Sequence, residues 1–132
     1  MIEPTPEELY ELAYEMLSDA LWLCNGKRYK GAFYLCGYAV EMGLKYKICK
    51  VYDLNVYPGN HPQRHRLVSH KLEELLIFAK LQDQKNALFL DEWSVVTKWD
   101  PAIRYSAKKL ASEDVELMIS ATQSLLEKIC SK

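Results

Sequence analysis

The chain has few features of a small metal-bound or disulfide-bonded protein. Its four cysteines are scattered, and no two stand at the C-x-x-C spacing (Cys24, Cys36, Cys49 and Cys130). Such scattering predicts neither a zinc site nor a disulfide framework. We therefore expect the cysteines to be small apolar core residues in a reducing compartment, and we expect no metal and no cofactor.

Long hydrophobic runs are also missing. The longest nearly apolar stretch extends from Gly31 to Val40 and ends at Glu41, well short of the roughly 20 residues that a membrane span needs. The first residues, MIEPTPEE, are acidic, whereas a secretory signal peptide begins with basic residues. We expect a soluble, cytoplasmic protein without membrane association.

Repeats and low-complexity segments are absent as well. The 132 residues fit a single domain spanning 1–132. A domain of this size buries roughly two thirds of the surface that its unfolded chain exposes. We expect a core that needs no covalent support.

Charge is unevenly distributed, although the net charge is only −1. Residues 1–26 contain six acids and no Lys or Arg, whereas residues 27–71 contain nine Lys or Arg and two acids. The basic middle predicts either a surface for phosphates or acidic partners, or neutralisation by the acidic first helix inside the fold. Both interpretations stay open.

Two long helices are expected at the start of the chain. Thr5-Pro6-Glu7-Glu8 has the form of a capping box and predicts a helix over 6–24, ended by Asn25-Gly26, where positive φ is tolerated. A second helix over 28–51 has apolar residues on more than one side. We expect it to be the central helix, or to meet another subunit.

The remainder is expected to contain shorter helices. Residues 53–69 are rich in turn residues, and a third helix should begin near His70, capped by Ser69. A weaker helix over 84–98 should end at Asp100-Pro101, and a last helix should start behind Ser112. The fold class is all-α, an up-and-down helical bundle of four to five helices. In such a bundle the basic loop 60–71 and the turn 99–105 share one pole.

Three motifs occur in order: GAFYLCGYAVEMGLKYKI in the second helix, SHKLEELL opening the third, and WDPAIRY before the last. Together they resemble the HEPN (higher eukaryotes and prokaryotes nucleotide-binding) family over about residues 9–130. The resemblance implies a helical bundle that commonly dimerises. The family includes metal-independent ribonucleases, toxins partnered by nucleotidyltransferase antitoxins, and inactive binding relatives.

The ribonucleases of that family use R-x(4-6)-H, in which arginine stabilises the phosphate and histidine moves a proton. No histidine follows Arg104 at that spacing, and Tyr105 is a poor base because its ordinary pKa is near 10. Arg64 and His70 formally satisfy R-x(5)-H, but they lie ahead of the third helix. His70 is either a helix-end residue or the partner of Arg104 in a split site. The three histidines match no zinc spacing and are expected to be solvated (His61, His65 and His70).

The ligand-binding candidates each have a structural alternative. Arg104 suits a phosphate or a salt bridge to Asp100, and Trp99 either stacks on a base or packs against the bundle end. Lys45 is a ligand contact or half of a surface ion pair with Glu41. The expected anion-binding pole consists of Lys50, Arg64, Arg66 and Arg104.

The sequence therefore predicts a HEPN-like nucleotide- or RNA-binding or partner-regulating module rather than an enzyme. We expect a homodimer with a possible nucleotidyltransferase-type partner. One alternative is a metal-independent endoribonuclease, of toxin or antiviral type, with a split Arg104/His70 site. The other is a structural homodimeric interaction protein.

Overall fold

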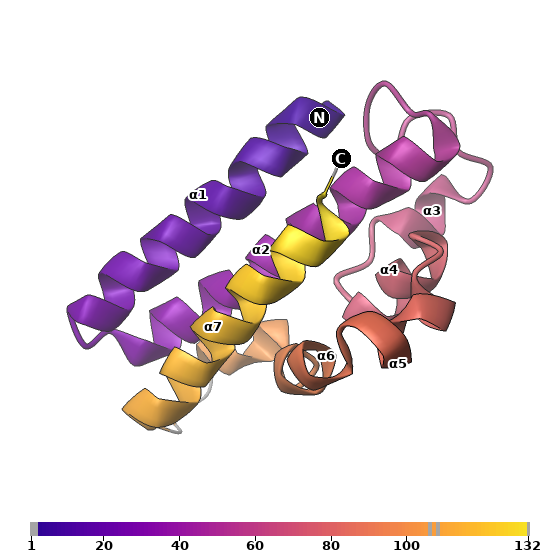
Figure 1. Cartoon of the computed structure of the whole chain (residues 1–132). Coiled ribbons are helices and arrows are strands. Elements are labelled where there is room, and N and C mark those ends of the chain that lie inside the picture. The colour runs from indigo at the N-terminus through magenta and orange to yellow at the C-terminus, as the bar shows by residue number, and fades with distance from the viewer. Residues whose placement is uncertain (1–2, 106, 108, 132) are drawn as a thin grey trace.

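The computed structural model describes residues 3–105, 107 and 109–131, and within these ranges the chain is helical with no strand. The all-α prediction is confirmed. The described residues form seven α-helices and two 3-10 helices, where four to five helices were expected: α1 (Pro6–Asn25), α2 (Tyr29–Tyr52), α3 (Arg64–Leu67), α4 (Leu72–Phe78), η1 (Gln82–Gln84), α5 (Lys85–Leu88), α6 (Leu90–Val96), η2 (Pro101–Tyr105) and α7 (Ser112–Ile129). Three long helices, α1, α2 and α7, lie together, and the short helices gather on one side of them (Figure 1).

Helix α1 begins at the predicted capping box. The amide of Glu8 donates to Thr5 Oγ1 at 3.2 Å, and the amide of Thr5 donates to Glu8 Oε1 at 2.9 Å. At the other end Gly26 keeps φ at −86° because its N–H still bonds to helix carbonyls, and the positive φ of 62° falls on Lys27. The end of the helix was predicted to within a residue. The positive φ was expected at Asn25 or Gly26 and lies instead at Lys27.

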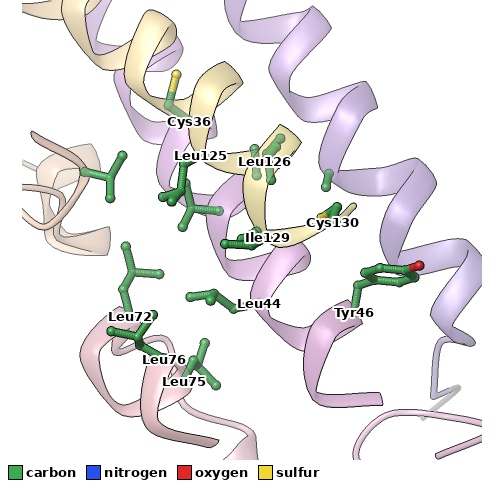
Figure 2. Packing of buried hydrophobic residues seen from close by; sticks show 14 of the residues in the cluster. Cys36, Leu44, Tyr46, Leu72, Leu75, Leu76, Leu125, Leu126, Ile129 and Cys130 are labelled. Atoms are coloured by element: carbon green, nitrogen blue, oxygen red, sulfur yellow. The ribbon is translucent and has the colours of Figure 1, made fainter. Parts of the chain in front are cut away.

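Helix α2 is the central helix, as one of the two interpretations predicted. It contacts α1, α7, α4, η2 and α6, and half of its residues are buried. Figure 2 shows Leu44 of α2 among leucines of α4 and residues of α7 (Leu72, Leu75, Leu76, Leu126 and Ile129). Because these elements cover several sides of α2, its apolar residues do not by themselves require a second subunit.

Helix α7 runs in the same direction as α2. Its first turns lie beside Phe33, with Asp114 and Leu117 lining the same surface pocket, whereas Cys130 Sγ lies 3.9 Å from the carbonyl oxygen of Gly43. A Cβ on Gly43 would stand 2.6 Å from Leu126, so the glycine permits this close packing. The up-and-down order, which places α7 antiparallel to α2, is wrong for the last helix.

The short helices explain this direction. Helices of four to seven residues are about 6–10 Å long, against about 36 Å for the 24 residues of α2. They cannot cross from pole to pole in one step. Residues 53–105 return along α2 in stages, and α7 begins near the start of α2 (Figure 1).

The predicted helix over 84–98 is interrupted. Phe89 stands between α5 and α6 with φ −151° and ψ 36°, and its side chain is buried against Trp93. The break lets the ring enter the core. Helix α4 also begins two residues after the predicted start at His70, and Ser69 Oγ accepts from the amide of Lys71, at 2.9 Å, in the turn before it.

The predicted shared pole is wrong for residues 60–66. They lie at the C-terminal end of α2, where the ring of His61 packs edge-on against Tyr52 with centroids 4.5 Å apart. Trp99 instead packs on Gly37. Gly37 precedes Tyr52 by fifteen residues, which is about 22 Å along the helix. The end of the basic segment, Ser69, His70 and Lys71, lines one pocket with the Trp99 turn.

Candidate functional site

A surface pocket of about 560 Å³ lies between two segments that are distant in the sequence. One wall is Ser69–Glu73, at the start of α4, and the other is formed by Thr97 and by Trp99–Pro101, ahead of η2 (residues Ser69, His70, Lys71, Leu72, Glu73, Thr97, Trp99, Asp100 and Pro101). The two motifs that were quoted around His70 and Trp99 therefore meet in one place.

The backbone of α2 fixes Trp99. Its indole Nε1 donates to the carbonyl oxygen of Tyr34 at 3.0 Å, and a Cβ on Gly37 would stand only 1.9 Å from the ring. The glycine is therefore required for the ring to reach the helix. Trp99 is 6% exposed, so it forms a packed wall of the pocket and offers no open face on which a base could stack.

Tyr38 links the two walls. Its ring packs edge-on against His70, with centroids 5.7 Å apart, and against Trp99, with centroids 5.1 Å apart. Edge-to-face aromatic pairs at these distances are favourable. The position of His70 is thus coupled to the position of the Trp99 turn through one side chain of α2.

A buried carboxylate holds His70. Glu41 Oε1 lies 2.9 Å from His70 Nδ1, and Glu41 Oε2 accepts from Lys45 Nζ at 2.8 Å. The side chain of Glu41 is 1% exposed and that of Lys45 is 12% exposed, whereas His70 is 55% exposed. A buried charge is tolerated only when it is paired and hydrogen bonded.

The expected surface ion pair between Glu41 and Lys45 is therefore buried. Lys45 also lies over the ring of Tyr57, with Nζ 5.3 Å from the centroid, and it does not line the pocket. The sequence contained a signal that was missed: Glu41 follows Gly37 by four residues and precedes Leu44 by three, on the buried stripe of α2. A carboxylate on such a stripe needs an internal partner.

Two further carboxylates line the pocket, and both are already hydrogen bonded. Glu73 Oε1 accepts from the indole of Trp93 at 3.0 Å, and Asp100 Oδ1 accepts from the amide of Ala102 at 2.9 Å. Lys71 is exposed and makes no ion pair with another residue that the structure describes. The polar groups of the two walls that remain available to a ligand include the ammonium of Lys71 and the exposed side of the His70 ring.

Arg104 and Tyr105 follow the pocket wall in the chain. Their backbone belongs to η2, and Arg104 is three residues from Pro101, about 6 Å along a 3-10 helix. Their side chains lie outside what the structure describes. The pairing of Arg104 with His70, with Asp100 or with a phosphate stays a prediction.

The other predicted anion-binding residues lie elsewhere and have partners within the chain. Arg64 bonds to Glu3 Oε2 at 2.7 Å, which lowers the pKa of Glu3, and also to the carbonyl of Gly59. Arg66 lies 3.5 Å from Glu74 and over the ring of Phe78, and Lys50 lies over the ring of Tyr46. None of these cations lines the pocket.

Arg64 and His70, which formally satisfy R-x(5)-H, have separate partners in the structure. Arg64 bonds to Glu3, and His70 bonds to Glu41. His61 is buried rather than solvated, with 8% exposure, and its Nδ1 accepts from the amide of Gln63 at 3.0 Å. Within the described ranges no group of three His, Cys, Asp or Glu side chains is placed to hold a metal ion.

The cysteines are free, and three of them are buried as expected. Burial raises the pKa of Cys36 and of Cys130 to about 12 and that of Cys49 to about 11. Thiols with such pKa values stay protonated and are weak nucleophiles. They do not contribute to the site.

No protein-family model matches the chain, and no curated protein or solved structure matches it. Among the described helices, none is long and apolar enough to cross a membrane.

Proposed function

We propose that the chain is a HEPN-like module that binds nucleotides or RNA in the pocket between His70 and Trp99. The observation that carries the proposal is the meeting of two of the three resembling motifs around one pocket, with His70 and Lys71 on its wall. The resemblance to the family was based on the order of the motifs, and their contact through Tyr38 is independent of that order.

The pocket has the composition that a nucleotide needs. Its volume of about 560 Å³ lies within the 300–1,000 Å³ that is usual for small-ligand sites. Leu72, Trp99 and Pro101 provide apolar walls for a sugar, and Lys71 provides a charge for a phosphate. Arg104 follows in the chain, and its guanidinium has the geometry to bind a phosphate with two parallel hydrogen bonds.

A direct binding measurement tests the proposal. Fluorescently labelled ribonucleotides and short single-stranded RNA are titrated with the wild type, with Lys71→Met and with Arg66→Met as a matched control. We expect Lys71→Met to weaken binding about ten- to a hundredfold, because a charge-assisted hydrogen bond contributes about 1.5–3 kcal/mol. Arg66→Met should bind like the wild type, because Arg66 already pairs with Glu74. Equal effects of the two variants, or no binding at low salt, would reject the pocket as the ligand site.

A second candidate function is endoribonuclease activity with Arg104 and His70 as a split pair. The bond between Glu41 and His70 favours it, since a buried carboxylate that orients an imidazole is a common arrangement for a general base. Metal-free cleavage of RNA with a 2′,3′-cyclic phosphate end, lost in both His70→Ala and Arg104→Ala, would establish it. A base of this kind is worth about 10²–10⁴ in rate, so intact RNA in the wild-type reaction would exclude this function.

Association with other chains is proposed on the resemblance together with one surface feature. Leu21 and Trp22, on the last turns of α1, are exposed by 43% and 78%. Large exposed apolar side chains are a feature of interaction surfaces. If the chain is a homodimer, analytical sedimentation at micromolar concentration should show a dimer for the wild type and a monomer for Trp22→Gln. A nucleotidyltransferase-type partner would instead bind a chain that sediments as a monomer.

A further inference from the structure

Two histidines of the chain have opposite hydrogen-bond surroundings. The Nδ1 of His61 lies 3.0 Å from a backbone N–H, that of Gln63, which can only donate. The Nδ1 of His70 lies 2.9 Å from the carboxylate of Glu41. Since an imidazole nitrogen either donates or accepts, the two rings must carry their proton differently when they are neutral.

The surroundings of Glu41 determine the direction of its bond to His70. An ionised carboxylate only accepts hydrogen bonds. Lys45 Nζ, 2.8 Å from Oε2, supplies the opposite charge that a carboxylate with 1% exposure requires. Nδ1 of His70 must therefore donate to Oε1. In the neutral ring the other nitrogen, Nε2, then has no proton, and no described residue bonds to it.

We infer that Glu41 is a positioning residue that holds His70 with its proton on Nδ1, so that Nε2 of this half-exposed, pocket-lining ring is left as a hydrogen-bond acceptor. An acceptor at this place binds a hydroxyl group and not a phosphate oxygen. On the proposed function, the group opposite His70 is a ribose hydroxyl, and the phosphate lies toward Lys71. The pocket therefore distinguishes a ribonucleotide from the deoxy analogue that lacks the hydroxyl opposite His70.

Glu41→Gln provides a specific test, because the variant is nearly isosteric and retains one carbonyl oxygen. Lys45 can only donate and therefore takes that oxygen, which turns the amide NH2 toward His70. Nδ1 must then accept, and the proton moves to Nε2. The substitution thus reverses the tautomer of His70 without removing the ring.

Nitrogen-15 NMR of the histidine rings in mildly alkaline buffer measures the tautomers directly, without a ligand. We expect the Nδ1–H form for His70 in the wild type, the Nε2–H form for His70 in Glu41→Gln, and the Nε2–H form for His61 in both proteins. His61 serves as the internal control, because a general loss of structure would change both rings. Finding His70 as Nε2–H in the folded wild type would overturn the inference.

The ligand part of the inference is tested by comparing a ribonucleotide with its 2′-deoxy and 3′-deoxy analogues. Loss of the hydroxyl that His70 binds should weaken affinity about two- to tenfold in the wild type. In Glu41→Gln the Nε2–H can donate to a hydroxyl oxygen but equally to a phosphate oxygen, so the preference for the hydroxyl-bearing nucleotide should be smaller in this variant than in the wild type. Equal binding of all analogues to the wild type would overturn this part. If nothing binds while the NMR result is as expected, the proposed function fails and the tautomer assignment stands.

Discussion

Two places along α2 receive residues from the basic middle of the chain, and they use these residues differently. At the C-terminal end, Arg64 and Arg66 bond to Glu3 and Glu74, and the charges are satisfied where the segment attaches to the bundle. Near the middle of α2, Glu41 is buried beneath His70, and Lys71 has no described counter-charge. The availability of a cation therefore depends on where its counter-charge lies and not on how many cations a segment contains.

Removing one member of each ion pair should give the largest contrast between the two places. Lys45→Met leaves the carboxylate of Glu41 buried with His70 alone, and we expect the free energy of unfolding to fall by about 3 kcal/mol. Arg64→Met removes a cation whose side chain is 55% exposed and should change stability little. Urea denaturation of both variants measures the difference. Similar losses would mean that the burial of Glu41 has no energetic consequence.

A substitution that displaces Trp99 from α2 should destabilise the packing beside the pocket, whereas the same substitution at a glycine away from Trp99 should not. In Gly37→Ala the new Cβ meets the indole, and we expect a loss of about 2 kcal/mol together with a change in tryptophan fluorescence. Gly31→Ala is the matched control in the same helix, because its Cβ would meet only Leu23 Cδ1, at 3.2 Å. Alanine favours a helix by up to about 1 kcal/mol, so the control should be neutral or stabilising. A stabilised Gly37→Ala would contradict the packing.

The smallest effect is expected from a carboxylate that joins α6 to α7. Lys128 and Ser124 hydrogen bond to Glu92 and lower its pKa. The folded pKa lies below the unfolded one, so this contribution to stability is complete above the unfolded pKa and is lost as pH falls through the folded pKa. Glu92→Gln should therefore flatten the acid side of the stability profile. Glu3→Gln, whose side chain is more exposed than that of Glu92 (25% against 15%), should flatten it less, and the reverse order would argue against the α6–α7 contact.

Local signals predicted the long helices well. The capping box places the start of α1 where Thr5 and Glu8 exchange hydrogen bonds, and the apolar positions on several sides identify α2 as the central helix. The break at Phe89 was missed because a helical periodicity describes neighbours along the chain, whereas Phe89 is placed by the core. The direction of α7 was missed because short connections impose an antiparallel order only on helices that cross the bundle, and α3 to α6 are too short to cross it.

The site was only partly predictable for the same reason. His70 and Trp99 were expected near each other, and they do contact a common residue, Tyr38. Arg64 was expected beside them but bonds to Glu3, which is 61 residues away in the sequence. Glu41 was assigned to the surface because its spacing to Lys45 is also that of an exposed helix pair. In each case the position of the side chain depends on a partner that is distant in the sequence.

The burial of three thiols makes the chain convenient to label. Cys36, Cys49 and Cys130 lie in the core with raised pKa values, so a maleimide reagent reaches them slowly in the folded protein. Cys24 is partly exposed on the last turn of α1. A fluorophore can therefore be attached at Cys24 without substituting any cysteine, and modification of the other three thiols reports opening of the core.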